Sequence, residues 1–95
     1  MQGYELTVIM DPDIIEEDTP QALEKVSTLI DKSGGTVDEV NHRGRKRLAY
    51  PIDRHKEGNY VYLRLQLEAA RTSELEADLN LASEYLRHLL VKLSD

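Results

Sequence analysis

Cysteine is missing from this chain of 95 residues, and so are tryptophan and phenylalanine. Without cysteine the chain forms no disulfide and offers no thiol nucleophile or thiolate metal ligand. Five tyrosines supply the large aromatic side chains. The longest apolar run near the N-terminus, residues 8–10, is far shorter than a membrane span, and no signal-peptide pattern precedes it. We therefore expect a protein of the cytoplasm, with no membrane partner.

Positive charge is scarce over most of the chain. Eighteen acidic and twelve basic side chains give a net charge of −6. Half of the cations nevertheless lie in residues 41–56, which carry +5 while the rest of the chain carries −11. Because an acidic protein repels polyanions, this basic segment is either a solvated strand edge that blocks aggregation or a contact surface for phosphates. Charge alone leaves both interpretations open.

Two stretches alternate between apolar and polar residues as half-buried strands do. They are residues 4–10 and residues 60–67. The expected inward side chains are Tyr4, Leu6, Val8 and Met10 in the first stretch, and Val61, Leu63, Leu65 and Leu67 in the second.

The basic segment lies in a further strand that begins after a pair of glycines. Val37 and Val40 are three residues apart, so a bulge between them is needed to bring both to the core face. We expect this strand to end at Pro51. Residues 53–59 then form a polar turn, in which Gly58 is available for a positive φ.

Helical spacing of apolar residues occurs twice. Residues 19–32 carry an apolar stripe and end at a Ser-Gly-Gly sequence, since glycine adopts the left-handed conformation without strain. A second helix covers about 70–81, where Ser73 and Glu76 have the spacing of a capping box; a start one turn earlier is also compatible. Residues 85–93 form a last strand, and its two apolar faces predict cover on part of both sides.

The element order is β-α-β-β-α-β in a chain long enough for one domain, residues 1–95. This order predicts an α+β fold, the ferredoxin-like sandwich, with a four-stranded antiparallel sheet and both helices on one face. The other face of the sheet stays open, and alternation places Tyr60, Tyr62 and Arg64 on it. An exposed face with two tyrosines is typical of a partner surface.

Two classes of binding function fit such a face. One is RNA binding, as in RNA recognition motifs, which stack bases on aromatic residues of strands one and three. Strand one has no outward aromatic residue here, so stacking is not expected to be the main mode. The other is a regulatory domain that binds a small molecule or a protein. We expect no enzyme, metal or cofactor, because no nucleophile has a base beside it and the histidines lack ligand spacing.

Several motifs resemble one family over essentially the whole chain. They are Tyr4-Glu5, Asp11-Pro12, Gly44 with the block Arg-Leu-Ala-Tyr-Pro-Ile at 47–52, Gly58-Asn59-Tyr60, and residues 86–92. These residues resemble the bacterial-type ribosomal small-subunit protein six family. The resemblance implies a non-enzymatic structural component of the cytoplasmic small ribosomal subunit. It also implies binding to the central domain of small-subunit ribosomal RNA together with small-subunit protein eighteen, and no small-molecule substrate.

The expected sites follow from the basic segment, the open face and this resemblance. The expected RNA contacts are Arg43, Arg45, Lys46, Arg47 and, by its match to a family arginine, Arg87. The expected partner contacts are Tyr50, Tyr60, Tyr62 and Arg64, with the apolar outer edge of the last strand as a further candidate. Since side chains alternate along a strand, only about half of the cations reach one RNA surface. We therefore expect tight RNA binding to require a basic protein partner.

Overall fold

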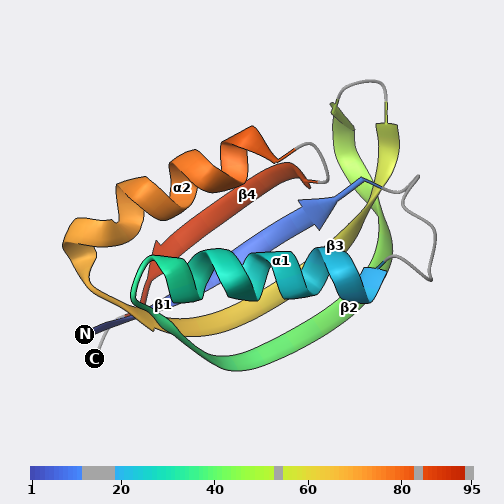
Figure 1. Ribbon diagram of the computed structural model, residues 1–95. Coiled ribbons are helices and arrows are strands. Elements are labelled where there is room, and N and C mark those ends of the chain that lie inside the picture. The colour runs from blue at the N-terminus through green and yellow to red at the C-terminus, as the bar shows by residue number, and fades with distance from the viewer. Residues whose placement is uncertain (12–18, 53–54, 83–84, 94–95) are drawn as a thin grey trace.

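The computed structural model describes residues 1–11, 19–52, 55–82 and 85–93, with the side chains of Thr19, Arg45, residues 49–52 and His55 outside that description. Within these ranges the elements follow the expected order (Figure 1). They are β1 (Gln2–Met10), α1 (Thr19–Lys32), β2 (Thr36–Ile52), β3 (His55–Leu67), the short 3₁₀ helix η2 (Ala69–Arg71), α2 (Thr72–Leu81) and β4 (Tyr85–Lys92). None of these helices is long and apolar enough to cross a membrane.

The four strands form one sheet in the order β2-β3-β1-β4, and all neighbours are antiparallel. Both helices lie on one face of this sheet, and they contact each other (Figure 1). The arrangement confirms the predicted ferredoxin-like sandwich. It makes β1 and β3 central and β2 and β4 the edge strands. The start of β1 and the end of β4 lie at the same end of the molecule (Figure 1).

The core lies between the helices and the two central strands. The predicted inward residues of β1 and β3 are all buried, which confirms the alternation. The helices add apolar side chains four positions apart, a spacing that brings them to one side of a helix. These are Ala22, Val26 and Ile30 in α1, and Leu75 and Leu79 in α2. Each buried leucine stabilises the fold by about 1.5–3 kcal/mol relative to an exposed one.

α1 ends in the glycine-containing turn that the sequence predicts. Gly34 has a φ of +83°. Its N–H donates to the Asp31 carbonyl at 2.9 Å, and the Gly35 N–H donates to the Ile30 carbonyl at 2.9 Å. This pair is a Schellman motif, which satisfies carbonyls left open at a helix end. A Cβ on Gly35 would lie 2.7 Å from the Gln66 backbone oxygen, so glycine here also permits the close passage of the chain over β3.

α2 begins earlier than Ser73, at Thr72 directly after η2. Arg71 is the N-cap and makes no capping hydrogen bond with its side chain. The capping box of Ser73 with Glu76 is therefore wrong, and the alternative of an earlier start is correct. The Thr72 hydroxyl donates to the Ala69 carbonyl at 2.9 Å and joins η2 to α2.

The β2–β3 hairpin is longer than the sequence predicts. β2 continues through Pro51 to Ile52, and β3 already begins at His55. Residues 55–59 are thus strand instead of the predicted polar turn, while residues 53–54 lie outside the description. Proline is tolerated here because β2 is an edge strand, where a missing N–H need not break the ladder.

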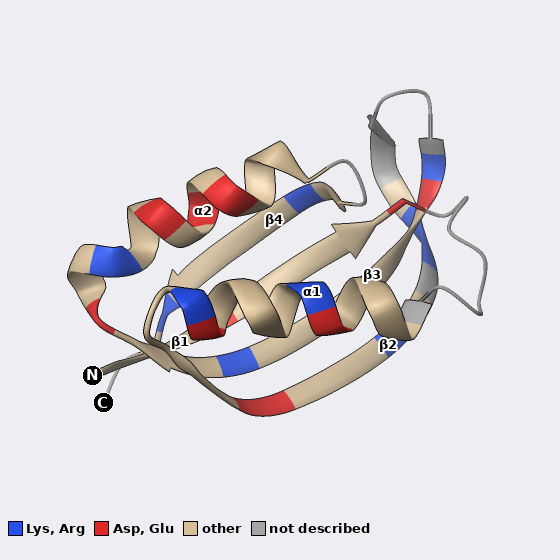
Figure 2. Cartoon of the chain, in the orientation of Figure 1, with Lys and Arg blue, Asp and Glu red and all other residues tan. Residues whose placement is uncertain are grey.

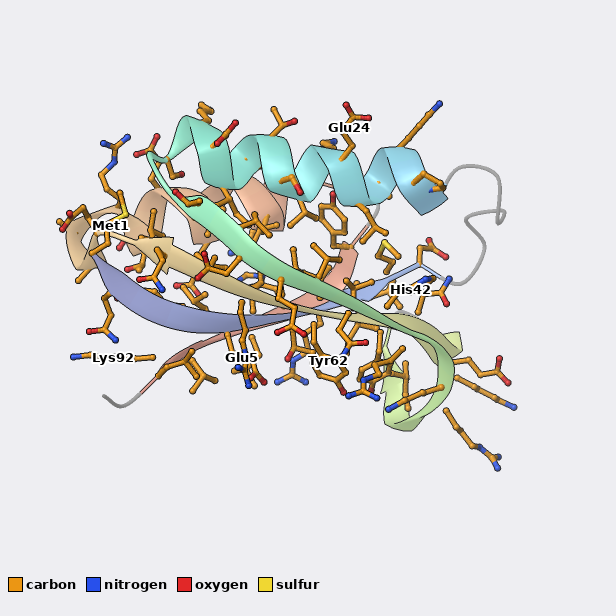
Figure 3. The ribbon with its side chains drawn as sticks, turned by 90° about the horizontal axis from the view of Figure 1, so that it is seen from below. Met1, Glu5, Glu24, His42, Tyr62 and Lys92 are labelled. Carbon is orange, nitrogen blue, oxygen red and sulfur yellow. The ribbon has the colours of Figure 1, made fainter. Side chains whose placement is uncertain are left out.

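In the described part of the chain, no third strand lies beside the far end of this hairpin. β1 pairs with β3 only as far as Met10 opposite Asn59. Beyond that point, residues 46–52 and 55–58 project past the rest of the sheet (Figure 1). We call these residues the arm. Figure 3 shows that the arm bends toward the side of the sheet opposite to the helices.

Gly58 lies in the arm but does not have the predicted positive φ. Among the described glycines, Gly34 and Gly44 have a positive φ. Gly58 is buried where the arm bends over β1. A Cβ at this position would collide with Cγ2 of Ile9 and lie 3.6 Å from Cδ2 of Leu48. Close packing, and not backbone conformation, is therefore what requires glycine at position 58.

The edge strands are less covered than the sequence predicts. A bulge after Val37 is present, and Val40 pairs with Leu63 on the core face. Val40 is nevertheless 46% exposed, because it lies on the outermost strand. On β4, Leu89 is 59% exposed and Val91 is 47% exposed. The open face of the last strand, for which the sequence predicts partial cover, is thus about half exposed at these two positions.

Candidate nucleic-acid interface

The antiparallel register arranges the open face in rows across the sheet, because directly paired residues point to the same side. In one row, Arg64 of β3 lies between Glu5 of β1 and Glu39 of β2. The two following rows are Asn41, Tyr62, Thr7 and Leu89, and then Gly44, Tyr60, Ile9 and Arg87. Figure 3 shows Glu5 and Tyr62 pointing away from the helices. The predicted placement of Tyr60, Tyr62 and Arg64 on the open face is confirmed.

A second bulge in β2 decides which cations share this face. The β2–β3 register shifts between His42 and Gly44, and Gly44 has a φ of +82°. Arg43 and Lys46 are three residues apart, so strict alternation would place them on opposite faces. The bulge brings both to the open face, and glycine accommodates the backbone conformation.

These two cations lie against the two tyrosine rings. The ring centroids of Tyr60 and Tyr62 are 6.4 Å apart, with the rings tilted by 39°. Lys46 Nζ is 5.6 Å from the Tyr60 centroid and 5.8 Å from the Tyr62 centroid. The Arg43 guanidinium carbon is 5.8 Å from the Tyr62 centroid. Because each such cation–π interaction contributes about 0.5–1 kcal/mol at exposed sites, the rings help to hold two positive charges on the surface.

Tyr62, Arg43 and Lys46 also border a hollow of about 320 Å³ on the open face. Its walls combine three cations with two carboxylates and an amide: Arg43, Lys46, Arg64, Glu5, Glu39 and Asn41. The sequence did not reveal that Asn41 and Glu39 border the tyrosines, because only the register of β2 against β3 brings them there. Alternation along β1 predicts that Glu5 points outward, but it does not identify the neighbours of the carboxylate.

The remaining predicted RNA contacts are spread more widely. Arg47 is exposed on the arm. Arg87 is on the open face of β4, three strand spacings or about 14 Å from β2. The side chains of Arg45 and Tyr50 lie outside the description, although the backbone of both belongs to β2. The structure thus groups Arg43 and Lys46 and leaves Arg87 across the sheet from them.

The described histidine side chains are not arranged for catalysis. His88 Nε2 lies 3.2 Å from Glu76 Oε1, and the His88 side chain is 13% exposed. His88 is therefore the packed, hydrogen-bonded residue that its position between two leucines predicts. His42 is exposed on the edge strand β2. Within the described ranges, no group of three His, Asp or Glu side chains could hold a metal ion.

Charged residues are distributed unevenly over the molecule (Figure 2). Acidic residues gather on α2, whereas lysines and arginines lie at the far end of the β2–β3 hairpin. On α2 the acids are Glu74, Glu76 and Asp78. A chain with a net charge of −6 can thus present a basic surface, because half of its cations lie in residues 41–56, away from the acids of α2.

Comparison with known proteins gives a consistent set of relatives. The sequence profile described as "Ribosomal protein S6" matches residues 3–92. A small ribosomal subunit protein bS6 of Mycolicibacterium paratuberculosis is 42% identical over 87 residues, covering 92% of this chain and 91% of that protein. A bS6 protein of Desulforudis audaxviator is 35% identical over 92 residues, covering 97% of this chain and 98% of that protein.

Solved structures agree with these sequence matches. The crystal structure of 30S ribosomal protein S6 from Thermotoga maritima superposes with a TM-score of 0.90 at 26% identity, covering 97% of this chain and 87% of that one. The C-terminal domain of the MgtC protein from Mycobacterium tuberculosis has a TM-score of 0.63 at 13% identity, which shows a similar fold alone. The chain belongs to the ribosomal protein S6 family and is a structural, non-enzymatic component of the small ribosomal subunit in the cytoplasm, with ribosomal RNA and ribosomal proteins as partners.

Proposed function

We propose that residues 1–95 act as one domain that binds the central domain of small-subunit ribosomal RNA together with small-subunit protein eighteen. The observation that carries this proposal is the placement of Arg43 and Lys46 on two tyrosine rings of the open face. Cations held at an exposed surface, on the side of the sheet opposite to the acidic helix α2, suit the phosphates of an RNA backbone.

In this proposal the basic hairpin contacts phosphates and does not read bases. Arg43, Arg45, Lys46 and Arg47 supply the main contacts, and Arg87 adds one from β4. Such contacts position a protein on RNA without recognising sequence. The protein partner is contacted by Tyr50 and, on the open face, by Tyr60, Tyr62 and Arg64.

A few phosphate contacts do not give tight binding at physiological salt, and the acidic remainder of the chain repels RNA. We infer that small-subunit protein eighteen supplies the missing positive charge. The chain therefore binds the RNA weakly alone and strongly with its partner.

The test is a titration of the purified chain against central-domain RNA, with and without small-subunit protein eighteen, at two salt concentrations. Tight, salt-dependent binding only in the presence of the partner supports the proposal. Equal affinity without the partner would make the chain an autonomous RNA-binding module. An absence of binding under both conditions would contradict the RNA-binding proposal altogether.

A further inference from the structure

We propose that one side of the arm is a preformed phosphate site, in which Lys56 acts beside Lys46 and which Leu48 and Ile9 hold in position. This inference rests on the proposed function, because it concerns how the same chain contacts ribosomal RNA. Figure 3 shows that the arm bends toward the side of the sheet opposite to the helices. We call the side of the arm that faces the open face of the sheet its inner side.

Ile9 is buried although it lies on the open face. It pairs with Tyr60 on one side and Arg87 on the other, yet it is only 9% exposed. The helices do not cover it, because they lie on the opposite face of the sheet (Figure 1). The arm does, since Cγ2 of Ile9 occupies the space that a Cβ of Gly58 would need.

Leu48 completes this contact from the other strand of the arm. Its Cδ2 atom lies 3.6 Å from the same Cβ position, and the residue is 8% exposed. Leu48 and Ile9 therefore meet at Gly58, and neither belongs to the described core cluster between the helices and the sheet. Because burial of apolar surface favours the folded arrangement, this separate contact holds the arm against the sheet.

The register assigns the described side chains of the arm to two sides. Lys46 pairs with Gly58, and Arg47 pairs with Glu57. Directly paired residues point to the same side of a sheet, and so do residues two apart in one strand. Since Gly58 faces Ile9, its side is the inner one. The inner side carries Lys46, Leu48, Lys56 and Gly58, and the outer side carries Arg47 and Glu57.

The two sides of the arm differ in charge. The outer side places a cation opposite an anion, whereas the described side chains of the inner side include two exposed lysines and no carboxylate. Lys46 Nζ lies 5.6 Å from the centroid of the Tyr60 ring, so the inner side continues the basic part of the open face. Two cations without a neighbouring anion attract phosphates. Lys56 thus adds a phosphate contact from β3 to those of residues 43–47 on β2.

A fixed arm favours binding because ordering flexible groups on association costs conformational entropy. In the described part of the chain the arm has no strand beside it beyond Met10. Its direction therefore depends on the contact of Leu48 with Ile9. These two side chains are positioning residues, and the lysines are the groups that touch the RNA.

The contact and the positioning have different effects on salt dependence. Binding of the full chain to central-domain RNA would be measured with small-subunit protein eighteen present, at four or more salt concentrations. Lys56→Gln should lower the slope of log K against log salt by about 0.7–0.9, as expected for one lost phosphate contact. Lys92→Gln is the control with the same change in charge, because Lys92 is exposed at the other end of the molecule (Figure 3). It should leave the slope nearly unchanged.

Leu48→Ala should lower the affinity roughly three- to tenfold at every salt concentration and leave the slope unchanged, because the same phosphates are then bound by a less ordered arm. Leu48→Met, which conserves volume, should restore most of the affinity. Val26→Ala is the control for stability, since Val26 is buried in the main core on the helix side. It should not change RNA affinity at a temperature where thermal unfolding shows that all variants are folded.

Four other results would overturn the inference. If Lys56→Gln keeps the slope of the unaltered chain, Lys56 does not contact a phosphate, and the proposed function survives. If Lys56→Gln instead weakens binding of small-subunit protein eighteen without RNA, the inner side is a protein contact. If Leu48→Ala binds RNA as Val26→Ala does, the contact with Ile9 does not position the arm. If the unaltered chain with its partner does not bind the RNA, the proposed function fails as well.

Discussion

Two buried hydroxyl groups differ in their hydrogen bonding. The Tyr85 hydroxyl donates to the Ala22 carbonyl at 2.7 Å in the interior and ties the start of β4 to α1. The Ser33 hydroxyl, at the end of α1, is buried with no hydrogen-bond partner among the described residues. A buried polar group costs free energy unless it is hydrogen-bonded. Removal of the Tyr85 hydroxyl is therefore expected to lower the free energy of unfolding, whereas removal of the Ser33 hydroxyl is not.

Tyr85→Phe should lower the free energy of unfolding by about 1–2 kcal/mol, because it leaves the buried Ala22 carbonyl without this donor. Urea denaturation at constant pH measures the change. Tyr60→Phe is the control, since its ring is only half-buried and lies on the open face. An equal loss in the two variants would show that the buried hydrogen bond contributes nothing specific.

Ser33→Ala should leave the free energy of unfolding unchanged or raise it by up to about 1 kcal/mol, since it removes a desolvated hydroxyl that gains no hydrogen bond. The same urea experiment applies. A loss of stability above this range would mean that the hydroxyl has a partner, such as a bound water.

At the scale of elements, periodicity located all four strands and both helices. This worked because the buried residues follow a period of two in β1 and β3 and a helical period in α1. The sequence does not predict the arm. Pro51 and Gly58 were interpreted as breakers, but an edge strand tolerates proline, and Gly58 permits close packing over Ile9.

Gly58→Ala should destabilise the fold by about 1–3 kcal/mol, because the added methyl group overpacks the contact with Ile9. Gly3→Ala is a matched control on a neighbouring strand, where the nearest atom to the new Cβ would be 3.6 Å away. It should change stability much less. Denaturant titrations of both variants give the comparison.

A double-mutant cycle identifies the cause of this loss. In an Ile9→Ala background the colliding Cγ2 atom is absent, so Gly58→Ala should cost less than it does in the unaltered chain. If the cost is the same in both backgrounds, Gly58 is required for a reason other than its contact with Ile9.

At the scale of the whole molecule, a chain with a net charge of −6 can bind RNA because half of its cations lie together in residues 41–56. Replacing Arg43 and Lys46 together by Gln should lower the slope of log K against log salt by about 1.4–1.8, as expected for two lost phosphate contacts. The measurement is RNA binding with small-subunit protein eighteen present, at four or more salt concentrations.

The control variant changes the net charge by the same amount, but at a different place in the molecule. Lys25→Gln with Lys32→Gln removes two cations from α1, on the helix side of the molecule. The exposed pair of Lys32 with Asp78 at 3.4 Å contributes little to stability. If this control changes the salt slope as much as the first variant does, RNA binding depends on net charge and not on the placement of Arg43 and Lys46.

The order of residues was sufficient for the fold class, the face of each central strand and the family resemblance, because these depend on local periodicity and on contiguous motifs. The composition of the open face required the folded chain. Arg43 and Lys46 share that face through a bulge at Gly44, and Glu5 pairs with Val91, which lies 86 residues further along the chain. Register between distant strands results from packing of the whole core, and no local pattern encodes it.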